Sequence, residues 1–316
     1  MHILERVDPS DHRKETEHEL QKTSSASEAR WTNNGALRMK SLKPILDRFY
    51  KEFDFRERLL HDPIEFPHKY KTPEDIEVSG FIASCLAYGR VELFKPVVEK
   101  ILSLMGEHPY SFLMDFDAGK QGRRFTFKYR FNESRDILCL LFIIHELLKK
   151  YSSVEAAFKS YYAPDDQDTG KGIIGLVADI MSINTSVIYG RDIHPHGMTH
   201  FFPTPAKGSA CKRMNLFLRW MVRDRDIDFG IWKGIPKNKL VIPLDTHIAR
   251  ISRCLGFTRR ASADWKAALE ITAALKKFDP ADPLKYDFAL CHHGISGVCT
   301  AQKSPGCREC VFKNDP

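Results

Sequence analysis

Apolar residues recur along most of the chain at the spacing of an amphipathic helix. The segment SLKPILDRFYKEF carries them at i, i+3, i+4 and i+7, on one helix face: Leu42, Ile45, Leu46 and Phe49. Comparable spacing recurs at 77–88, 92–106, 137–151, 153–162, 173–182, 213–222, 247–256, 264–278 and 284–294. Few stretches alternate with the period of two that a half-buried strand requires. The pattern therefore predicts about ten helices and an all-α protein.

Three regions of the 316-residue chain differ in composition. Residues 1–40 are polar without a sustained apolar period, so we expect a disordered tail there. Residues 41–290 carry the helical pattern and are long enough to form one substantial domain or two sub-domains of a compact protein. Residues 291–316 form a Cys-rich C-terminal tail that holds four of the eight cysteines.

The apolar runs are too short for a membrane-spanning helix. The longest, ILCLLFII at 137–144, has eight residues. A span requires roughly 18. The N-terminus is charged from its fifth residue and lacks the apolar region of a signal peptide. We therefore expect a cytoplasmic, nucleoid-associated protein without disulfides.

Positive charge is concentrated in one segment. The whole chain has a net charge of +7, whereas residues 201–260 contain 13 Lys and Arg against four Asp, a local charge of +9. Such concentration is typical of proteins that bind nucleic acid, because phosphate contacts supply most non-specific affinity. A solvated, soluble surface would give the same excess, so charge alone leaves both interpretations open.

A lysine stands in the first turn of the helix predicted within GSACKRMNLFLRWMVR, residues 208–223. Lys212 lies on the side away from the apolar stripe, which consists of Met214, Phe217, Leu218, Met221 and Val222. The positive end of the helix dipole disfavours an ammonium group there, and only a free amine attacks carbon as a nucleophile. An exposed lysine that contributes solubility is the alternative. The preceding Pro-, Gly- and His-rich segment, 183–208, is predicted as a long functional loop.

An aspartate opens the helix predicted within LDTHIARISRCLG. Asp245 stands at a good N-cap position, directly before helical spacing through Ile248, Ile251 and Leu255. A structural cap worth about 1 kcal/mol is one interpretation of this residue. Its combination with Lys212 favours a second interpretation, in which both side chains take part in catalysis.

These two segments resemble the helix-hairpin-helix (HhH-GPD) DNA glycosylase superfamily. KGSACKRMNLFL looks like its hairpin, in which the catalytic lysine follows the first glycine by four residues, as Lys212 follows Gly208. PLDTHIARI is similar to its VDTH segment, with Asp245 and His247 on the match. Lys212 and Asp245 are 33 residues apart, longer than in endonuclease III-like enzymes and similar to the archaeal 8-oxoguanine glycosylases. The wider pattern also resembles an uncharacterised bacterial branch. The resemblance implies two helical sub-domains with a cleft between them and a helix-hairpin-helix at about 203–256.

The resemblance also implies a chemistry. Double-stranded DNA with a damaged, perhaps oxidised, base would be the substrate, and the damaged nucleotide would be extruded from the helix. Lys212 would attack the sugar C1′, with Asp245 as general base, and the resulting Schiff base would permit AP-lyase cleavage. The amides of Gly208, Ser209 and Ala210 would bind a phosphate. Further expected phosphate contacts are Lys207, Arg213, Lys233, Lys237 and Lys239, and expected base-pocket residues are Tyr88, Arg90, His247 and the segment HPHGMTHFF.

The C-terminal cysteines raise a separate question. Cys299, Cys307 and Cys310 resemble the first three ligands of the [4Fe–4S] loop in endonuclease III-like enzymes, whose fourth cysteine this chain lacks. A cluster would need Cys291, a ligand from outside the chain or an incomplete coordination, and zinc could bind with Cys291 or a histidine such as His292. The alternative is that these cysteines hold no metal. Glycosylase chemistry itself requires no cofactor.

Two other classes of protein fit parts of the pattern. A non-catalytic DNA-binding module would keep the fold and use Lys212 as a phosphate contact and Asp245 as a cap. An interaction or metal-sensing protein would depend on the tail after residue 298 instead. The leading hypothesis is the glycosylase, acting as a monomer, because the two catalytic residue types occur in the family's order.

Overall fold

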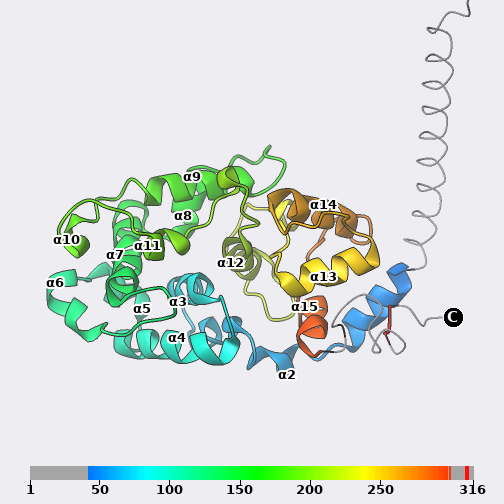
Figure 1. Ribbon diagram of the computed structural model, residues 1–316, viewed down its shortest axis with the longest axis horizontal. Helices are drawn as coiled ribbons and strands as arrows, with labels where there is room; N and C mark the ends of the chain where they lie inside the picture. Colours follow the sequence, from blue (N-terminus) through cyan, green and yellow to red (C-terminus); the bar gives the residue numbers. More distant parts are fainter. Residues whose placement is uncertain (1–41, 298, 300–309, 313–316) are drawn as a thin grey trace, which may run out of the picture.

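The computed structural model describes residues 42–297, 299 and 310–312. Within these residues the secondary structure is helical, and only two isolated β-bridges occur, so the all-α prediction is confirmed (Figure 1). The polar segment 1–40 and Cys307 lie outside the described residues. None of the helices in the described part is long and apolar enough to cross a membrane.

The helices follow one another with short connections. Residues 42–52 are helical. The α-helices after them are α2 (Phe55–Leu59), α3 (Pro73–Leu86), α4 (Val91–Met105), α5 (Pro109–Met114), α6 (Ala118–Gln121), α7 (Ser134–Tyr151), α8 (Val154–Lys159), α9 (Gly170–Ile180), α10 (Ser186–Tyr189), α11 (His196–His200), α12 (Lys212–Val222), α13 (Thr246–Leu255), α14 (Trp265–Lys276) and α15 (Asp287–Ile295). Single 3-10 turns occur at Pro63–Glu65, Pro67–Lys69, Gly122–Arg124, Pro205–Lys207 and Lys237–Lys239.

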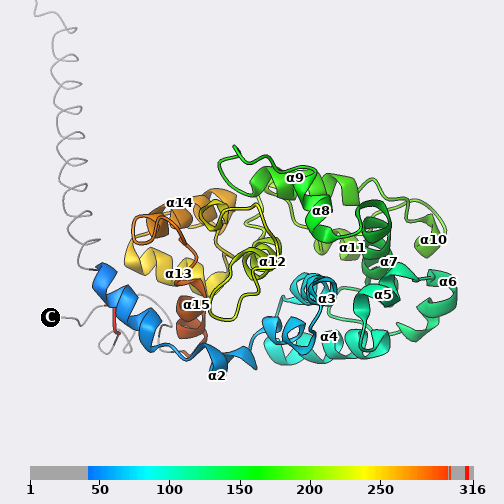
Figure 2. The ribbon, with the colours of Figure 1, turned by 180° about the vertical axis from the view of Figure 1, so that it is seen from behind.

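Two hydrophobic cores lie toward opposite ends of the molecule. The larger is built mainly from α3, α4, α5, α7, α8, α9 and α12, with Phe81 and Trp220 fully buried in it. The smaller combines residues 42–52 with α13, α14 and α15 around Ile271 and Leu290. Both views place α12 between α3 and the end formed by α13, α14 and α15 (Figure 1, Figure 2).

Helix α12 is buried all round, which corrects the prediction of an amphipathic helix. Each residue from Arg213 to Val222 is buried, and only Lys212 at its first position is partly exposed. The reason is that α12 packs on α3 along one side and faces the segments of the second core along another. Its polar residues are therefore interior groups with partners rather than a solvated face.

A buried ionic network joins α12 to the second core. Arg219 donates to Asp287 of α15 through Nη1 at 2.5 Å and to Asp228 through Nε at 3.2 Å. Arg223 donates to Asp282 through Nε at 2.9 Å and also pairs with Asp228. These two arginines belong to the segment of excess positive charge, so part of that charge is neutralised inside the protein instead of forming a surface.

Two predicted boundaries differ from the structure. The segment 183–208, expected to be one irregular loop, contains α10, α11 and a 3-10 turn, because its Pro and Gly residues separate short helical stretches rather than prevent them. Helix α15 runs across residue 290, where the Cys-rich tail was expected to begin. Cys291 is therefore part of a packed helix of the second core.

Candidate functional site

Lys212 and Asp245 meet where the two cores adjoin. Lys212 is the first residue of α12 in the larger core, and Asp245 is the N-cap of α13 in the smaller one. Lys212 Nζ lies 3.8 Å from Asp245 Oδ2, with the two side chains 37% and 13% exposed. The structure therefore brings together two residues that are 33 positions apart in the sequence and leaves the amine open to solvent.

The two carboxylate oxygens of Asp245 contact different groups. Oδ1 accepts from the backbone N–H of Ile248 at 2.8 Å, which caps α13 as the sequence predicted. Oδ2 faces Lys212 Nζ and also lies 3.5 Å from Cys291 Sγ. The capping bond fixes the side-chain orientation, and as a result the second oxygen points at the amine. One oxygen therefore caps the helix while the other faces the amine.

Cys291 lies against Asp245 rather than with the tail cysteines. Burial raises the pKa of its thiol well above the usual range, with the nearby Asp245 and Asp287 charges adding to that rise, so Cys291 donates its S–H to Asp245 Oδ2. His292, the other expected ligand, is buried with Nε2 3.4 Å from Asp62 Oδ2. Both residues thus face side chains outside the tail, and their role as metal ligands remains a prediction.

The described residues include two of the three tail cysteines of the four-iron motif that the sequence resemblance implies, because Cys307 lies outside them. No set of three His, Cys, Asp or Glu side chains in the described part of the chain is already arranged to hold a metal ion. Cys299 and Cys310 belong to the described part, and the Cys291 thiol donates to Asp245 Oδ2. We derive no chemistry at Lys212 from a cluster.

The hairpin before α12 has the backbone conformation that its glycine permits. Gly208 has φ +76° and ends the 3-10 turn Pro205–Lys207, and a Cβ added to it would meet nothing within 4 Å. Ser209 Oγ accepts from Cys211 N–H at 3.1 Å, and Gly208 C=O accepts from Trp265 N–H at 3.1 Å. These bonds hold the hairpin against the start of α14. The first helix of the expected helix-hairpin-helix is only this 3-10 turn.

The start of α12 is suited to bind an anion. Cys211 occupies its N-cap position with φ +50°, and no side chain within the described residues caps it. Helix N-termini present unpaired N–H groups and a positive partial charge. Ser209 and Lys212 lie at the same end of the helix, and both are partly exposed.

The predicted phosphate contacts have different environments. Lys207 and Lys233 are exposed, while Lys237 pairs with Asp224 at 2.7 Å and Lys239 donates to the Asp166 carbonyl at 2.5 Å. Arg213 is buried, which corrects its prediction as a phosphate contact. It is only 7% exposed, because its guanidinium donates to the buried carbonyls of Cys85 and His200.

An aromatic cluster lies beside Arg213, and it includes one predicted base-pocket residue. The Tyr88 ring stacks on Phe131 with centroids 5.3 Å apart and contacts His200 edge-on at 4.7 Å. Phe131 is 42% exposed, and the Arg213 guanidinium lies 5.1 Å from the Tyr88 ring centroid. Because Arg213 follows Lys212 directly, the cluster adjoins the start of α12. Tyr88 and the segment HPHGMTHFF, predicted separately, thus come together.

His200 is held in its neutral form within this aromatic cluster. Burial, reinforced by the charge of Arg213, lowers its pKa to about 4. Its Nδ1 lies 3.3 Å from Arg213 Nη1, and arginine is only a donor, so Nδ1 accepts and Nε2 carries the proton. The other two expected pocket residues differ. Arg90 is exposed at the N-cap of α4, and His247 packs against Gly294 of α15.

Sequence reasoning missed Phe131 and the true position of Cys291. Phe131 stands in no recognisable sequence motif. In the structure its neighbour Arg130 has a positive φ of 52°, which the sequence does not reveal. Cys291 was assigned to the tail by its position in the chain. Only the packing of α15 against α13 places it beside Asp245.

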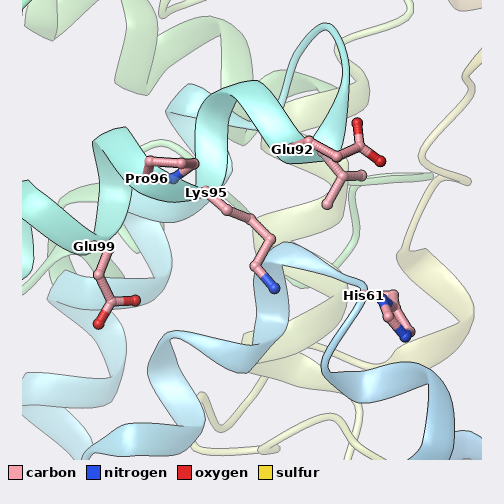
Figure 3. Close-up of a pocket in the computed structure, with 6 residues that line it drawn as sticks. His61, Glu92, Lys95, Pro96 and Glu99 are labelled. Atoms are coloured by element: carbon pink, nitrogen blue, oxygen red, sulfur yellow. The ribbon is translucent and has the colours of Figure 1, made fainter.

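A separate depression lies on the surface of α4. It has a volume of about 410 Å³, and Figure 3 shows its polar lining residues His61, Glu92, Lys95 and Glu99. Lys95 is engaged by Glu65 and by the Leu60 carbonyl. None of the predicted catalytic or base-pocket residues lines this depression, so it is not part of the site at Lys212.

Comparisons with known proteins identify a family without a described activity. Residues 62–296 match the profile of a family described as "Protein of unknown function (DUF2400)". No curated protein and no solved structure matches the chain. The matched region contains Lys212, Asp245 and Cys291 together with all the helices from α3 to α15.

Proposed function

The chain belongs to the DUF2400 family, and for this member we propose a DNA glycosylase with associated lyase activity that removes a damaged base from double-stranded DNA. The proposal assigns the nucleophile to Lys212 and the general base to Asp245. It also takes the two cores as the two sub-domains of a helix-hairpin-helix glycosylase, with the DNA lying across their junction.

One observation carries the proposal. A partly exposed amine at an uncapped helix N-terminus lies 3.8 Å from a carboxylate oxygen that belongs to the other core. Surface ion pairs are common and worth little, but this carboxylate is mostly buried and oriented by its capping bond. A base held next to a nucleophile and oriented by a third group is the arrangement that covalent catalysis uses.

The reaction follows from these positions. Asp245 Oδ2 accepts a proton from Lys212, and the neutral amine attacks C1′ of the damaged nucleotide. The bond from C1′ to the base breaks, and the base leaves with the electron pair and takes up a proton from solvent. Opening of the sugar ring then gives a Schiff base between Lys212 and C1′. Loss of the C2′ proton eliminates the 3′ phosphate and cuts the strand.

Neighbouring groups would hold the DNA. The N–H groups at the start of α12 and the Lys207 side chain would bind backbone phosphate, which positions the strand without reading its sequence. The exposed Phe131 ring and the His200 Nε2–H would contact the extruded base. Their contact with Arg213, the residue that follows Lys212 in α12, supports this assignment.

Borohydride trapping tests the proposal. The purified protein is incubated with duplexes that each carry 8-oxoguanine, thymine glycol or uracil, and the Schiff base is reduced to a stable covalent complex. We expect a complex on at least one lesion, its complete loss in Lys212→Ala, and a loss of at least about 100-fold in rate in Asp245→Asn. Asparagine caps helices as well as aspartate does, so Asp245→Asn should fold normally.

A DNA-binding module without catalysis is the second candidate function. It is favoured by the capping bond of Asp245, which by itself accounts for an aspartate at this position. In that case Asp245→Asn would leave DNA binding unchanged and stability within a few tenths of a kcal/mol, and no lesion would give a covalent complex. Salt-dependent binding to duplex DNA, measured by fluorescence anisotropy, would remain and would fall in Lys207→Ala.

A further inference from the structure

The carboxylate of Asp245 has a hydrogen bond to which the proposed reaction assigns no role. Its Oδ2 lies 3.5 Å from Cys291 Sγ, within hydrogen-bonding distance for sulfur, and 3.8 Å from Lys212 Nζ, beyond the usual length of an N–H···O bond. The thiol therefore hydrogen-bonds Oδ2, while the amine faces the same oxygen without a direct bond. The other oxygen, Oδ1, is held by the Ile248 N–H.

The thiol keeps its proton in these surroundings. Burial raises the pKa of Cys291 well above its usual range, and three carboxylates reinforce this effect while one amine opposes it. These four groups come from four segments around the thiol: Asp245 at the start of α13, Asp287 on α15, Lys212 on α12, and Asp62 before the 3-10 turn Pro63–Glu65. Reactive cysteines need positive surroundings that favour the thiolate, so Cys291 is a permanent hydrogen-bond donor and not a nucleophile.

The close packing of α15 on α13 fixes where the thiol lies. Gly294, one turn after Cys291 on α15, lies against His247 of α13, and a Cβ added to it would be 2.7 Å from His247 Cβ. Its carbonyl accepts from Arg250 Nη2 of α13 at 2.9 Å. The absence of a side chain at Gly294 therefore lets the two helices approach closely enough for the α15 thiol to reach the α13 cap, Asp245.

A thiol suits this position because it is a weak donor. A hydroxyl or an ammonium group would bond Oδ2 more strongly and so reduce its affinity for the proton of Lys212. An apolar side chain would leave one oxygen of a mostly buried carboxylate without this donor, and the loss would favour the protonated, inactive form of the base. The thiol lies between these extremes.

We propose that Cys291 is a positioning residue, whose S–H···Oδ2 bond holds the Asp245 carboxylate ionised and directed at Lys212. Its role in catalysis rests on the glycosylase proposal, whereas the bond itself does not. No covalent bond forms at Cys291, and its proton stays on sulfur. The proton that moves passes from Lys212 to Asp245 Oδ2, as in the proposed reaction.

The pH dependence of single-turnover base release tests the role in catalysis. In Cys291→Ala we expect the acid side of the profile to move up by about half a pH unit, equal to about a threefold lower rate there, because loss of the donor favours the protonated carboxyl. In Cys291→Ser, whose hydroxyl also donates, the acid side should stay at or below that of wild type. Cys139→Ala, at a fully buried thiol of α7 in the larger core, is the matched control and should keep the wild-type profile.

Infrared spectroscopy tests the bond without any DNA. The difference spectrum between wild type and Cys291→Ser isolates the S–H stretching band of Cys291, and a hydrogen-bonded thiol absorbs at a lower frequency than a free one. The same subtraction in Asp245→Asn should give the band at a higher frequency. The reason is that the capping bond keeps the amide oxygen on the Ile248 N–H, so the NH₂ group faces the thiol in place of an acceptor.

Three results would overturn the proposal: an unshifted S–H band in Asp245→Asn, an unchanged acid side in Cys291→Ala, or an equal shift in Cys139→Ala. If wild-type protein releases no base from any lesion, the glycosylase proposal fails, and the infrared comparison alone decides whether Cys291 holds Asp245. If Cys291→Ala fails to fold by circular dichroism, the Cys291→Ser profile and the infrared comparison decide it, and an acid side above that of wild type in Cys291→Ser counts against the proposal.

Discussion

Replacing Arg219 by methionine should destabilise the protein more than replacing an exposed arginine of the same segment. Arg219 is 2% exposed and donates to Asp287 and Asp228, whose side chains are 3% and 1% exposed. Asp228 keeps a partner in the variant, because Arg223 also pairs with it. Asp287 loses the only arginine that pairs with it in the described residues, and it becomes an uncompensated buried carboxylate.

The magnitude follows from the charge left behind. Burial raises the pKa of Asp287 to about 6 even with Arg219 in place, so without Arg219 its carboxyl stays protonated at pH 7. Keeping an aspartate of ordinary pKa near 3.9 neutral at pH 7 costs about 4 kcal/mol, but a pKa of about 6 already costs the wild type about 3 kcal/mol, so protonation accounts for about 1.4 kcal/mol of the difference. Removing one partner of a buried pair typically costs about 3–5 kcal/mol in total, so the remainder comes from the lost pairing with Asp228 and the lost hydrogen bonds.

The assay is urea unfolding followed by far-UV circular dichroism at several pH values. The free energy of unfolding of Arg219→Met should be about 3–5 kcal/mol lower than wild type at pH 7. The difference should shrink by about 1.4 kcal/mol in all between pH 7 and pH 5, mostly above pH 6, where wild-type Asp287 is still ionised. Arg225→Met, at an exposed arginine, is the matched control and should change stability by less than about 0.5 kcal/mol.

A double variant separates charge from packing. Adding Asp287→Asn to Arg219→Met should recover most of the lost stability at pH 7, because an amide removes the cost of keeping the Asp287 carboxyl protonated. The reasoning is refuted if the loss is below about 1 kcal/mol, if it is the same at pH 5 and pH 7, or if the second substitution lowers stability further.

Three further predictions concern single sites. Gly197→Ala should cost about 1–3 kcal/mol in urea unfolding, because its Cβ would lie 2.1 Å from Asp136 Oδ2, and an unchanged midpoint would contradict the packing described. Asp245→Ala should cost about 1 kcal/mol of thermal stability, and Asp245→Asn only a few tenths. Because the folded pKa of His200 is lowered to about 4, its contribution to stability is complete above pH 6.5 and is lost as the pH falls toward 4. His200→Gln should flatten this part of the stability profile measured by thermal unfolding, and an unaltered slope would exclude His200 as its source.

The sequence by itself determined the helices and their local signals. Helical periodicity depends on residues three and four positions apart, so segments such as α7 and α13 are recognisable without knowledge of their neighbours. The capping role of Asp245 is equally local, because its acceptor atom and the Ile248 N–H are only three residues apart. The positions of Lys212 and Asp245 at helix starts were predicted for the same reason.

Only the tertiary structure decided which groups are exposed and which meet. Arg213 and Arg219 look like surface cations in the sequence, yet α12 lies between two cores and both are buried. Cys291 was assigned to the tail, yet the packing of α15 on α13 places its thiol on Asp245. The 3.8 Å separation of Lys212 and Asp245 likewise depends on the docking of one core against the other. Local patterns fix the backbone of each helix, but the partner of a side chain depends on contacts between segments far apart in the chain, which no local pattern encodes.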